Sequence, residues 1–290
     1  MSENVPPRPN WLPESVFPFA DRYLDADGAR VHYVDEGEGP PLLMLHGNPT
    51  YSLLYRQIVD GLRDRFRCIA IDYPGFGLST APAGYGFTPA EHAAVVEHFV
   101  SELDLRDVTL MTQDWGGPIG FAVATRQPER FAAFVVGNTF AWPMNHKLGA
   151  RIFSGVLGGP IGGFLILRRN FFVEFILPRS LRRTKLAPEV MEAYRGPFPT
   201  PESRRPLHVF PREIIGSTPF LAEVESGLAA LRDRPALLVW PEKDPVFADE
   251  ERARWEGVFV EHRTVVLSGA GHYIQEDSPR EIVDAIRSWR

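Results

Sequence analysis

The hydrophobic pattern divides the first half of the chain into short segments of two kinds. Residues 30–35 alternate apolar and polar positions, as a half-buried strand would, whereas 42–45 and 68–71 are continuous apolar runs typical of strands covered on both faces. Between and after them, residues 53–62 and 89–105 carry apolar residues at helical spacing. Strands that alternate with helices predict a mostly parallel sheet with right-handed crossover connections.

The same rhythm continues to about residue 140 and returns near residue 236. It predicts four more strands and three more helices, at 108–111, 132–137, 236–240 and 264–267 and at 118–126, 249–255 and 279–289. Residues 141–215 lack this rhythm and are rich in Gly, Pro, Phe and Arg, which favours short helices separated by breakers. We therefore predict a core in two parts, 1–140 and 216–290, with an inserted helical cap at 141–215.

Charge distinguishes the predicted cap from the predicted core. The chain has a formal net charge of −6, which argues against a nucleic-acid partner. Residues 141–215 hold 12 Lys and Arg against 5 Asp and Glu, a net charge of +7, so the rest of the chain carries −13. A basic cap on an acidic core could pair with a second copy, which leaves a homo-oligomer open.

Targeting and membrane segments are not evident in the sequence. Residues 1–18 lack the apolar core of a signal peptide, and no run reaches the roughly 20 apolar residues of a membrane span, so we expect a cytoplasmic protein without a membrane partner. The uncharged run 152–167 is interrupted by five glycines and a proline; we interpret it as an apolar lid over a cavity rather than a membrane contact. Cys68, the single cysteine, lies in a strand-like run and is expected to be a buried core thiol.

Polar residues gather just after the predicted strands, where open α/β sheets bind their ligands. In chain order, they are His46-Gly47-Asn48-Pro49, Asp72, Asp114, Asn138-Thr139, Lys243-Asp244-Pro245 and Gly269-Ala270-Gly271-His272.

The segment Gln113-Asp114-Trp115-Gly116-Gly117 is the most informative of these. A strand leads into it and a helix follows, and it resembles the nucleophile elbow of the α/β-hydrolases with aspartate in the serine position. An aspartate is ionised at neutral pH and can attack carbon without a base. A helix N-cap is the simpler interpretation of Asp114, but the two glycines favour a tight elbow. Thr112 stands where the elbow pattern has its first glycine.

The other strand ends supply partners for Asp114. Taken alone, Asp244 before a proline could initiate a turn and His272 could be a surface histidine, but the order nucleophile, acid, histidine is the one this fold uses. The turn after the first buried strand is either purely structural or, with the backbone N–H groups of Asn48 and Trp115, an oxyanion hole. Asp72 is expected to brace a loop rather than react.

Together these motifs resemble those of the haloalkane dehalogenases over nearly the whole chain. The resemblance rests on four segments, 46–50, 72–79, 113–117 and 271–272. It implies an α/β-hydrolase fold with an eight-stranded, mostly parallel sheet flanked by helices, an inserted helical cap, and no cofactor or metal.

The resemblance also implies a role for each site residue. Asp114 would be the nucleophile, His272 the general base and Asp244 the acid that orients it, while the side-chain N–H groups of Asn48 and Trp115 would bind halide. The family's alternative acid position holds Asn138, which cannot serve as a carboxylate, so the resemblance is to the subgroup that uses Asp244.

The implied reaction is hydrolysis of a haloalkane through an alkyl ester on Asp114. The partners would then be a small halogenated aliphatic substrate, water and the halide product. An apolar pocket wall would come from the cap, with Phe153, Phe164, Leu165, Phe171 and Phe172 as candidates.

Two other functions stay open. An epoxide hydrolase would use the same triad but needs acids on the cap, and residues 141–215 contain a single tyrosine, Tyr194. A binding protein with this fold would have no need of the triad.

Overall fold

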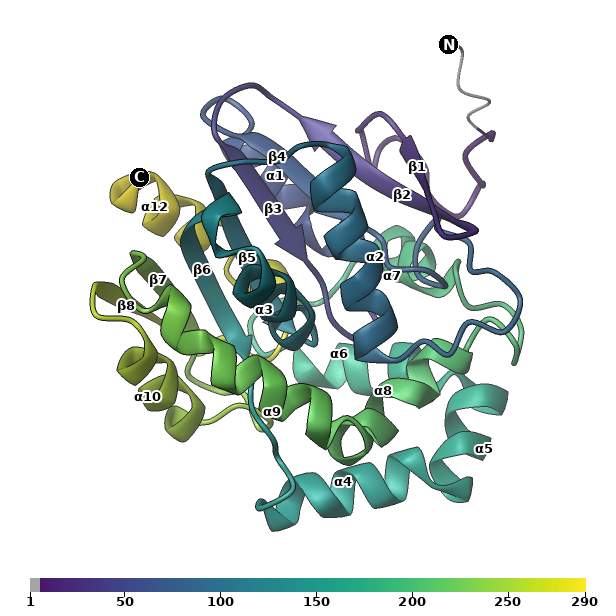
Figure 1. Ribbon diagram of the computed structural model, residues 1–290. Helices are drawn as coiled ribbons and strands as arrows, with labels where there is room; N and C mark the ends of the chain where they lie inside the picture. Colours follow the sequence, from purple (N-terminus) through teal and green to yellow (C-terminus); the bar gives the residue numbers. More distant parts are fainter. Residues whose placement is uncertain (1–5) are drawn as a thin grey trace.

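The computed structural model describes residues 6–290, so the first five residues of the N-terminal segment lie outside the described part. Its centre is one eight-stranded sheet in the order β1-β2-β4-β3-β5-β6-β7-β8 (Figure 1). The strands are β1 (Arg22–Ala26), β2 (Ala29–Glu36), β3 (Pro41–Leu45), β4 (Arg67–Ile71), β5 (Val108–Asp114), β6 (Phe131–Thr139), β7 (Ala236–Pro241) and β8 (His262–Leu267).

The six strands β3 to β8 pair with one another in parallel, whereas β2 pairs antiparallel with β1 and β4. Leu43 in β3 pairs with Ile69 on one side and Leu110 on the other, and all three side chains are buried. Burial on both faces explains why these central strands appear in the sequence as continuous apolar runs. Cys68 in β4 is buried, as predicted.

Helices cover both faces of the sheet (Figure 1). Helices α1 and α12 contact each other, and helices α2 and α3 contact each other. These and the other core helices are α1 (Arg56–Leu62), α2 (Pro89–Glu102), α3 (Gly116–Arg126), α9 (Thr218–Gly227), α10 (Asp249–Val258), α11 (Ile274–Asp277) and α12 (Pro279–Trp289), with short turns η1 (Ser52–Tyr55), η2 (Pro128–Arg130) and η4 (Leu228–Leu231).

Helix α2 shows how local sequence sets a helix start. Thr88 accepts a hydrogen bond from the backbone N–H of Glu91, and the Glu91 carboxylate accepts one from the backbone N–H of Thr88. Pro89 follows directly in the first turn, where its missing N–H costs nothing. The predicted helix 89–105 therefore begins at the predicted residue and ends three residues earlier, at Glu102.

An all-helical insertion lies between β6 and β7 (Figure 1). It contains α4 (Leu148–Gly158), α5 (Pro160–Arg169), η3 (Phe172–Ile176), α6 (Leu177–Ser180), α7 (Pro188–Arg195) and α8 (Arg205–Gly216). The exact division of the chain at 140 and 215 stays a prediction. Within residues 6–290, the apolar length needed to cross a bilayer is reached only by α4 and α5 taken together, and these two helices are bent by 58°.

Asp72, which follows β4, braces loops as the sequence predicted. Its buried carboxylate accepts hydrogen bonds from the backbone N–H groups of Ser52, at 2.7 Å, and Leu78, at 2.9 Å. A third partner is the His32 ring, whose Nδ1 lies 2.8 Å away. These contacts hold two of the loops at the carboxyl edge of the sheet, which is the structural role expected of Asp72.

Candidate active site

Asp114 is the last residue of β5 and has a φ of 51°, in the left-handed region that side-chain-bearing residues rarely adopt. Such a conformation costs about 1–3 kcal/mol and persists only where the surroundings enforce it. Here a Cβ on Gly116 would overlap the carbonyl of Leu45, and a Cβ on Gly117 would overlap Thr139. The two glycines thus let α3 start against neighbouring strands, and the elbow forms with threonine at position 112.

The three residues predicted as a triad lie together. His272 Nδ1 is 2.9 Å from Asp244 Oδ2, and His272 Nε2 is 3.8 Å from Asp114 Oδ2. Asp244 follows β7 and His272 follows β8, at the same edge of the sheet as Asp114. Gly271 lets the chain pass under the cap, because a Cβ there would overlap the carbonyl of Ser180, which accepts the His272 N–H at 2.9 Å.

Burial and charge set the proton affinities of the three groups. Burial raises the pKa of Asp114 above 3.8, although His272 and the N–H groups of Trp115 and Asn48 oppose that rise. Burial alone would lower the pKa of His272, but the charge and hydrogen bond of Asp244 and the charge of Asp114 outweigh it, so this pKa lies above 6.5. Burial disfavours ionised Asp244 too, yet His272 and other partners hold its pKa below 3.8.

Two backbone donors converge on the Asp114 carboxylate. The N–H of Asn48 donates to Asp114 Oδ1 at 2.9 Å, and the N–H of Trp115 donates to the same carboxyl group. These are the two groups predicted as the oxyanion hole. The turn that carries Asn48 is closely packed, since a Cβ on Gly47 would overlap the Asp114 side chain.

The side chains of Asn48 and Trp115 border the same cavity as Asp114 and His272. Asn48 Nδ2 lies 3.4 Å from the carbonyl of Leu207, a long contact that is easily exchanged, and among the described residues Asn48 Oδ1 has no partner. The Trp115 ring is fixed by Phe210, stacked at 5.2 Å, and by Phe140, edge-on at 5.1 Å.

The cavity holds about 410 Å³, within the range of small-molecule sites. Of the five predicted cap residues, Phe153 and Phe172 line it, whereas Phe164 and Leu165 on α5 and Phe171, just before η3, do not. The remaining wall is mostly apolar and includes residues the sequence did not single out: Phe140, Met144, Ala150, Ile176, Pro211, Ile214, Val246, Phe247 and Tyr273.

Sequence reasoning assigned no supporting role to several residues that contact the predicted triad. Asn138 Nδ2 donates to Asp244 Oδ2 at 2.5 Å and to the carbonyl of His272 at 2.8 Å, so this amide braces the acid for which it cannot substitute. Phe247 stacks on the His272 ring at 5.9 Å. Gln113 Nε2 lies 3.2 Å from His272 Nε2. This role could have been suspected from the sequence, because Gln113 directly precedes the predicted nucleophile.

Tyr273 links the two halves of the site, because its hydroxyl donates to the carbonyl of Asn48 at 3.2 Å. Replacing Tyr273 with phenylalanine removes one buried hydrogen bond that holds the Asn48 turn, a change of about 1 kcal/mol. We expect kcat to fall about fivefold while the fold is kept. Steady-state kinetics together with a thermal melt check this, with Tyr85→Phe as a control outside the site.

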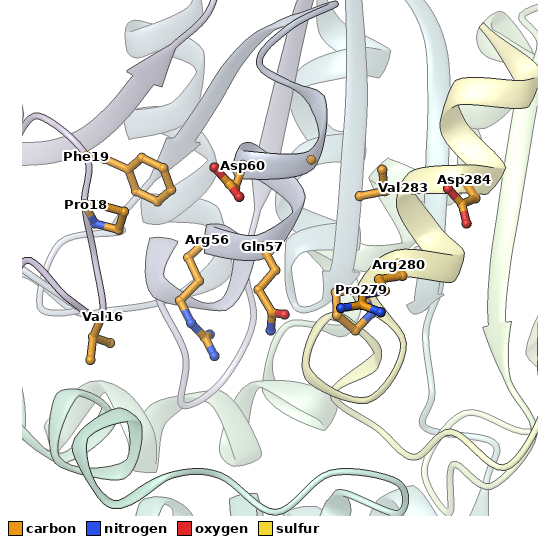
Figure 2. A pocket seen from close by; sticks show the side chains of 11 residues that line it. Val16, Pro18, Phe19, Arg56, Gln57, Asp60, Pro279, Arg280, Val283 and Asp284 are labelled. Carbon is orange, nitrogen blue, oxygen red and sulfur yellow. The ribbon is translucent and has the colours of Figure 1, made fainter.

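A second cavity of about 500 Å³ lies between α1 and α12 (Figure 2). Arg56, Gln57 and Asp60 border it from α1, and Arg280 and Asp284 from α12, so charges of both signs surround it. None of the predicted site residues lines it. Four of the predicted site residues, Asn48, Asp114, Trp115 and His272, line the smaller, mostly apolar cavity at the ends of the strands instead.

Comparison with known proteins agrees with this geometry. Residues 40–279 match a family model described as the alpha/beta hydrolase fold. Haloalkane dehalogenase 2 of Mycobacterium tuberculosis is 44% identical over 273 residues, which cover 93% of this chain and 95% of that protein. A haloalkane dehalogenase of Mesorhizobium japonicum is 34% identical over 89% of this chain and 87% of its own length.

Solved structures agree in shape. The crystal structure of haloalkane dehalogenase DbeA from Bradyrhizobium elkani superposes with a TM-score of 0.86 at 30% identity, covering 93% of this chain and 97% of that one. The fold and the site thus define an α/β-hydrolase. Within that class the chain belongs to the haloalkane dehalogenases, hydrolases that act on carbon–halide bonds.

Proposed function

We propose that this enzyme uses Asp114 as the nucleophile that displaces halide from an alkyl carbon. The observation that carries the proposal is the Asp114 carboxylate, strained at an elbow, held by two backbone N–H groups and facing an apolar cavity. In-line attack forms the carbon–oxygen bond of an alkyl ester as the carbon–halogen bond breaks, and the halide leaves with the bonding electron pair. No proton moves in this step.

The leaving halide is bound by the side-chain N–H groups of Asn48 and Trp115 in this proposal. Both are neutral donors, so they stabilise negative charge as it builds on the halogen without holding the product ion as a fixed cation would. The apolar wall excludes water and strengthens these interactions. Support comes from the position of both side chains at the same cavity as Asp114.

The ester is then hydrolysed with His272 as general base. Its Nε2 takes a proton from water, the water oxygen attacks the ester carbonyl carbon, and the N–H groups of Asn48 and Trp115 hold the oxyanion. Collapse of this intermediate releases the alcohol and restores the Asp114 carboxylate. Asp244, 2.9 Å from Nδ1, orients the ring and stabilises its charged form.

The substrate class proposed is a small halogenated aliphatic compound that fits a cavity of about 410 Å³. The epoxide alternative is disfavoured by Tyr194, whose hydroxyl donates to Glu276 Oε1 at 2.6 Å and which does not line the cavity. The alternative of a non-catalytic binding protein is disfavoured because binding alone does not require His272 to lie between Asp114 and Asp244.

Release of bromide from a panel of short bromoalkanes tests the proposed function. We expect turnover by the wild-type protein and none by Asp114→Ala, with Asp107→Ala, an exposed aspartate outside the site, as the matched control. An epoxide should give no diol. A dialkyl oxetan-2-one is a useful comparison substrate, because a decarboxylase of such compounds from Shewanella oneidensis is 28% identical to this chain. Turnover of either comparison substrate without bromide release would contradict the proposal.

The pH profile provides a separate prediction. The pKa of His272 is raised above 6.5, and the base works only when neutral, so steady-state turnover should fall as the pH drops through that raised pKa. Alkylation of Asp114 needs an ionised carboxylate and no base, so the pre-steady-state burst of halide should follow the ionisation of Asp114 and not that of His272. Rapid-quench measurement of the halide burst and of steady-state turnover between about pH 6 and 9 checks both expected pH dependences. A burst that titrates together with the steady state would contradict the division of roles.

A further inference from the structure

Helix α4 has two apolar faces, and the structure separates their roles. Its inner face packs on α8 and lends Ala150 and Phe153 to the cavity wall; Phe153 is the one residue of the predicted lid 152–167 that lines the cavity. The opposite face carries Leu148, Ile152 and Val156 at every fourth position, which aligns them along one side of the helix. These three side chains are 68%, 57% and 51% exposed.

Helix α5, which follows beyond the bend, also exposes large apolar side chains. Its Ile161 is 71% exposed and its Phe164 is 59% exposed. Figure 1 shows α4 and α5 at the outer margin of the cap, away from the sheet. We call the surface formed by Leu148, Ile152, Val156, Ile161 and Phe164 the α4–α5 face. Exposed apolar side chains in such a group mark a contact surface rather than ordinary scatter.

The charges around the α4–α5 face indicate what covers it. Residues 141–173 contain four Lys and Arg and no Asp or Glu. Lys147 is paired with Glu250 and Glu251 at the cavity mouth. Arg151, Arg168 and Arg169 are exposed, and within residues 6–290 none of them forms an ion pair. Unpaired arginines beside large apolar side chains are the pattern of helices that lie in an anionic lipid surface.

We propose that the α4–α5 face docks on a lipid bilayer that contains anionic lipids, with the apolar side chains among the acyl chains and the three arginines at the headgroups. A second copy of the chain fits this face less well, because a symmetric contact would bring the unpaired arginines of both copies together. The sequence predicted no membrane partner; this proposal departs from that expectation on the exposure of the outer face of α4, which is visible only in the folded chain.

Docking would also place the cavity next to a source of substrate. Phe153 lines the cavity and is 36% exposed, so it reaches both the pocket and the surface beside the α4–α5 face. Apolar haloalkanes partition into lipid, and an enzyme bound in this orientation receives them from the bilayer rather than from water. This delivery rests on the proposed function, whereas the docking itself does not.

Sedimentation of the full-length protein with vesicles tests the docking without any substrate. With phosphatidylcholine vesicles containing roughly a third phosphatidylglycerol we expect most of the protein in the pellet, at least fivefold less with pure phosphatidylcholine, and release at about 0.5 M salt. Ile152→Ser/Val156→Ser should abolish binding, and Arg168→Gln/Arg169→Gln should weaken it roughly tenfold or more. Val260→Ser and Arg22→Gln/Arg232→Gln, exposed positions elsewhere, are the matched controls and should bind as wild type.

Absence of binding to anionic vesicles would overturn the proposal, and so would binding that is equal in Ile152→Ser/Val156→Ser and wild type. Light scattering tests whether the α4–α5 face is instead a contact between two copies of the chain. In that case the wild type would form an oligomer that Ile152→Ser/Val156→Ser dissociates, and neither protein would bind vesicles. Delivery is read separately, from bromide release. Bromooctane held in anionic vesicles should be turned over several-fold more slowly by Ile152→Ser/Val156→Ser, while water-dissolved bromobutane is turned over equally. Failure with bromobutane in the wild type would count against the proposed function alone.

Discussion

His272→Phe is expected to stop turnover after a single alkylation, leaving the alkyl group covalently attached to Asp114. The first step needs no base, so the Asp114 carboxylate, held by the N–H groups of Asn48 and Trp115, still displaces halide. The second step needs a proton taken from water, and phenylalanine cannot take it. Loss of a general base costs roughly 100- to 10,000-fold, so steady-state bromide release should fall by at least that factor while one equivalent of halide appears in a burst.

Intact-protein mass spectrometry after incubation with bromobutane checks this result. The variant should gain the mass of one butyl group, and peptide mapping should place it on Asp114. His262→Phe, at an exposed histidine of β8, is the matched control and should turn over normally without an adduct. The double variant Asp114→Ala/His272→Phe should form no adduct. Normal turnover by His272→Phe would remove the role given to this histidine.

Asn48→Ala and Trp115→Phe should each lower kcat/KM by roughly 100- to 1000-fold, by analogy with the loss of one oxyanion-hole donor. Each substitution removes a side-chain N–H at the cavity but leaves the backbone N–H that holds the Asp114 carboxylate. The effect should therefore fall on the halide-displacing step, and bromide should inhibit the variants more weakly than the wild type.

Single-turnover kinetics and bromide inhibition separate the halide site from a purely structural role. Asn145→Ala and Trp289→Phe, at positions outside the cavity, are controls for the two residue types. If both site variants lose less than about threefold, the halide-site assignment is wrong. If they lose activity but keep normal bromide inhibition, Asn48 and Trp115 act by positioning Asp114 instead.

The elements that the sequence predicted well share one physical cause. Strands β3, β4, β5 and β7 lie in the sheet interior, so most of their residues are buried, and the apolar runs within them are visible without a structure. Helix α12 begins at Pro279 and ends at Trp289, as predicted, because one apolar face repeats at helical spacing. Strand β1 lies at the sheet edge with a shorter pattern, and its limits were not foreseen.

Helix ends were less predictable where no cap residue marks them. The helix after the elbow was expected from residue 118 and begins at Gly116, because the chain turns directly from Asp114 into α3. The strand before it extends to Asp114 rather than ending at residue 111, since hydrogen bonding to β6 continues to Thr139. Both differences reflect neighbours that are remote in the sequence.

Sequence alone determined the fold class and the family and predicted the five proposed site positions, because strand burial and strand-end motifs are local properties of the chain. The left-handed backbone of Asp114, the amide of Asn138 on Asp244 and the hydroxyl of Tyr273 on Asn48 join segments far apart in the sequence, so tertiary structure alone could supply them. The cap follows the same rule. Its apolar residues were evident from the start, but which of them line the cavity and which face outward depends on how α4 packs against α8. An apolar side chain is equally suited to a pocket wall or an exposed contact surface, and packing decides between them.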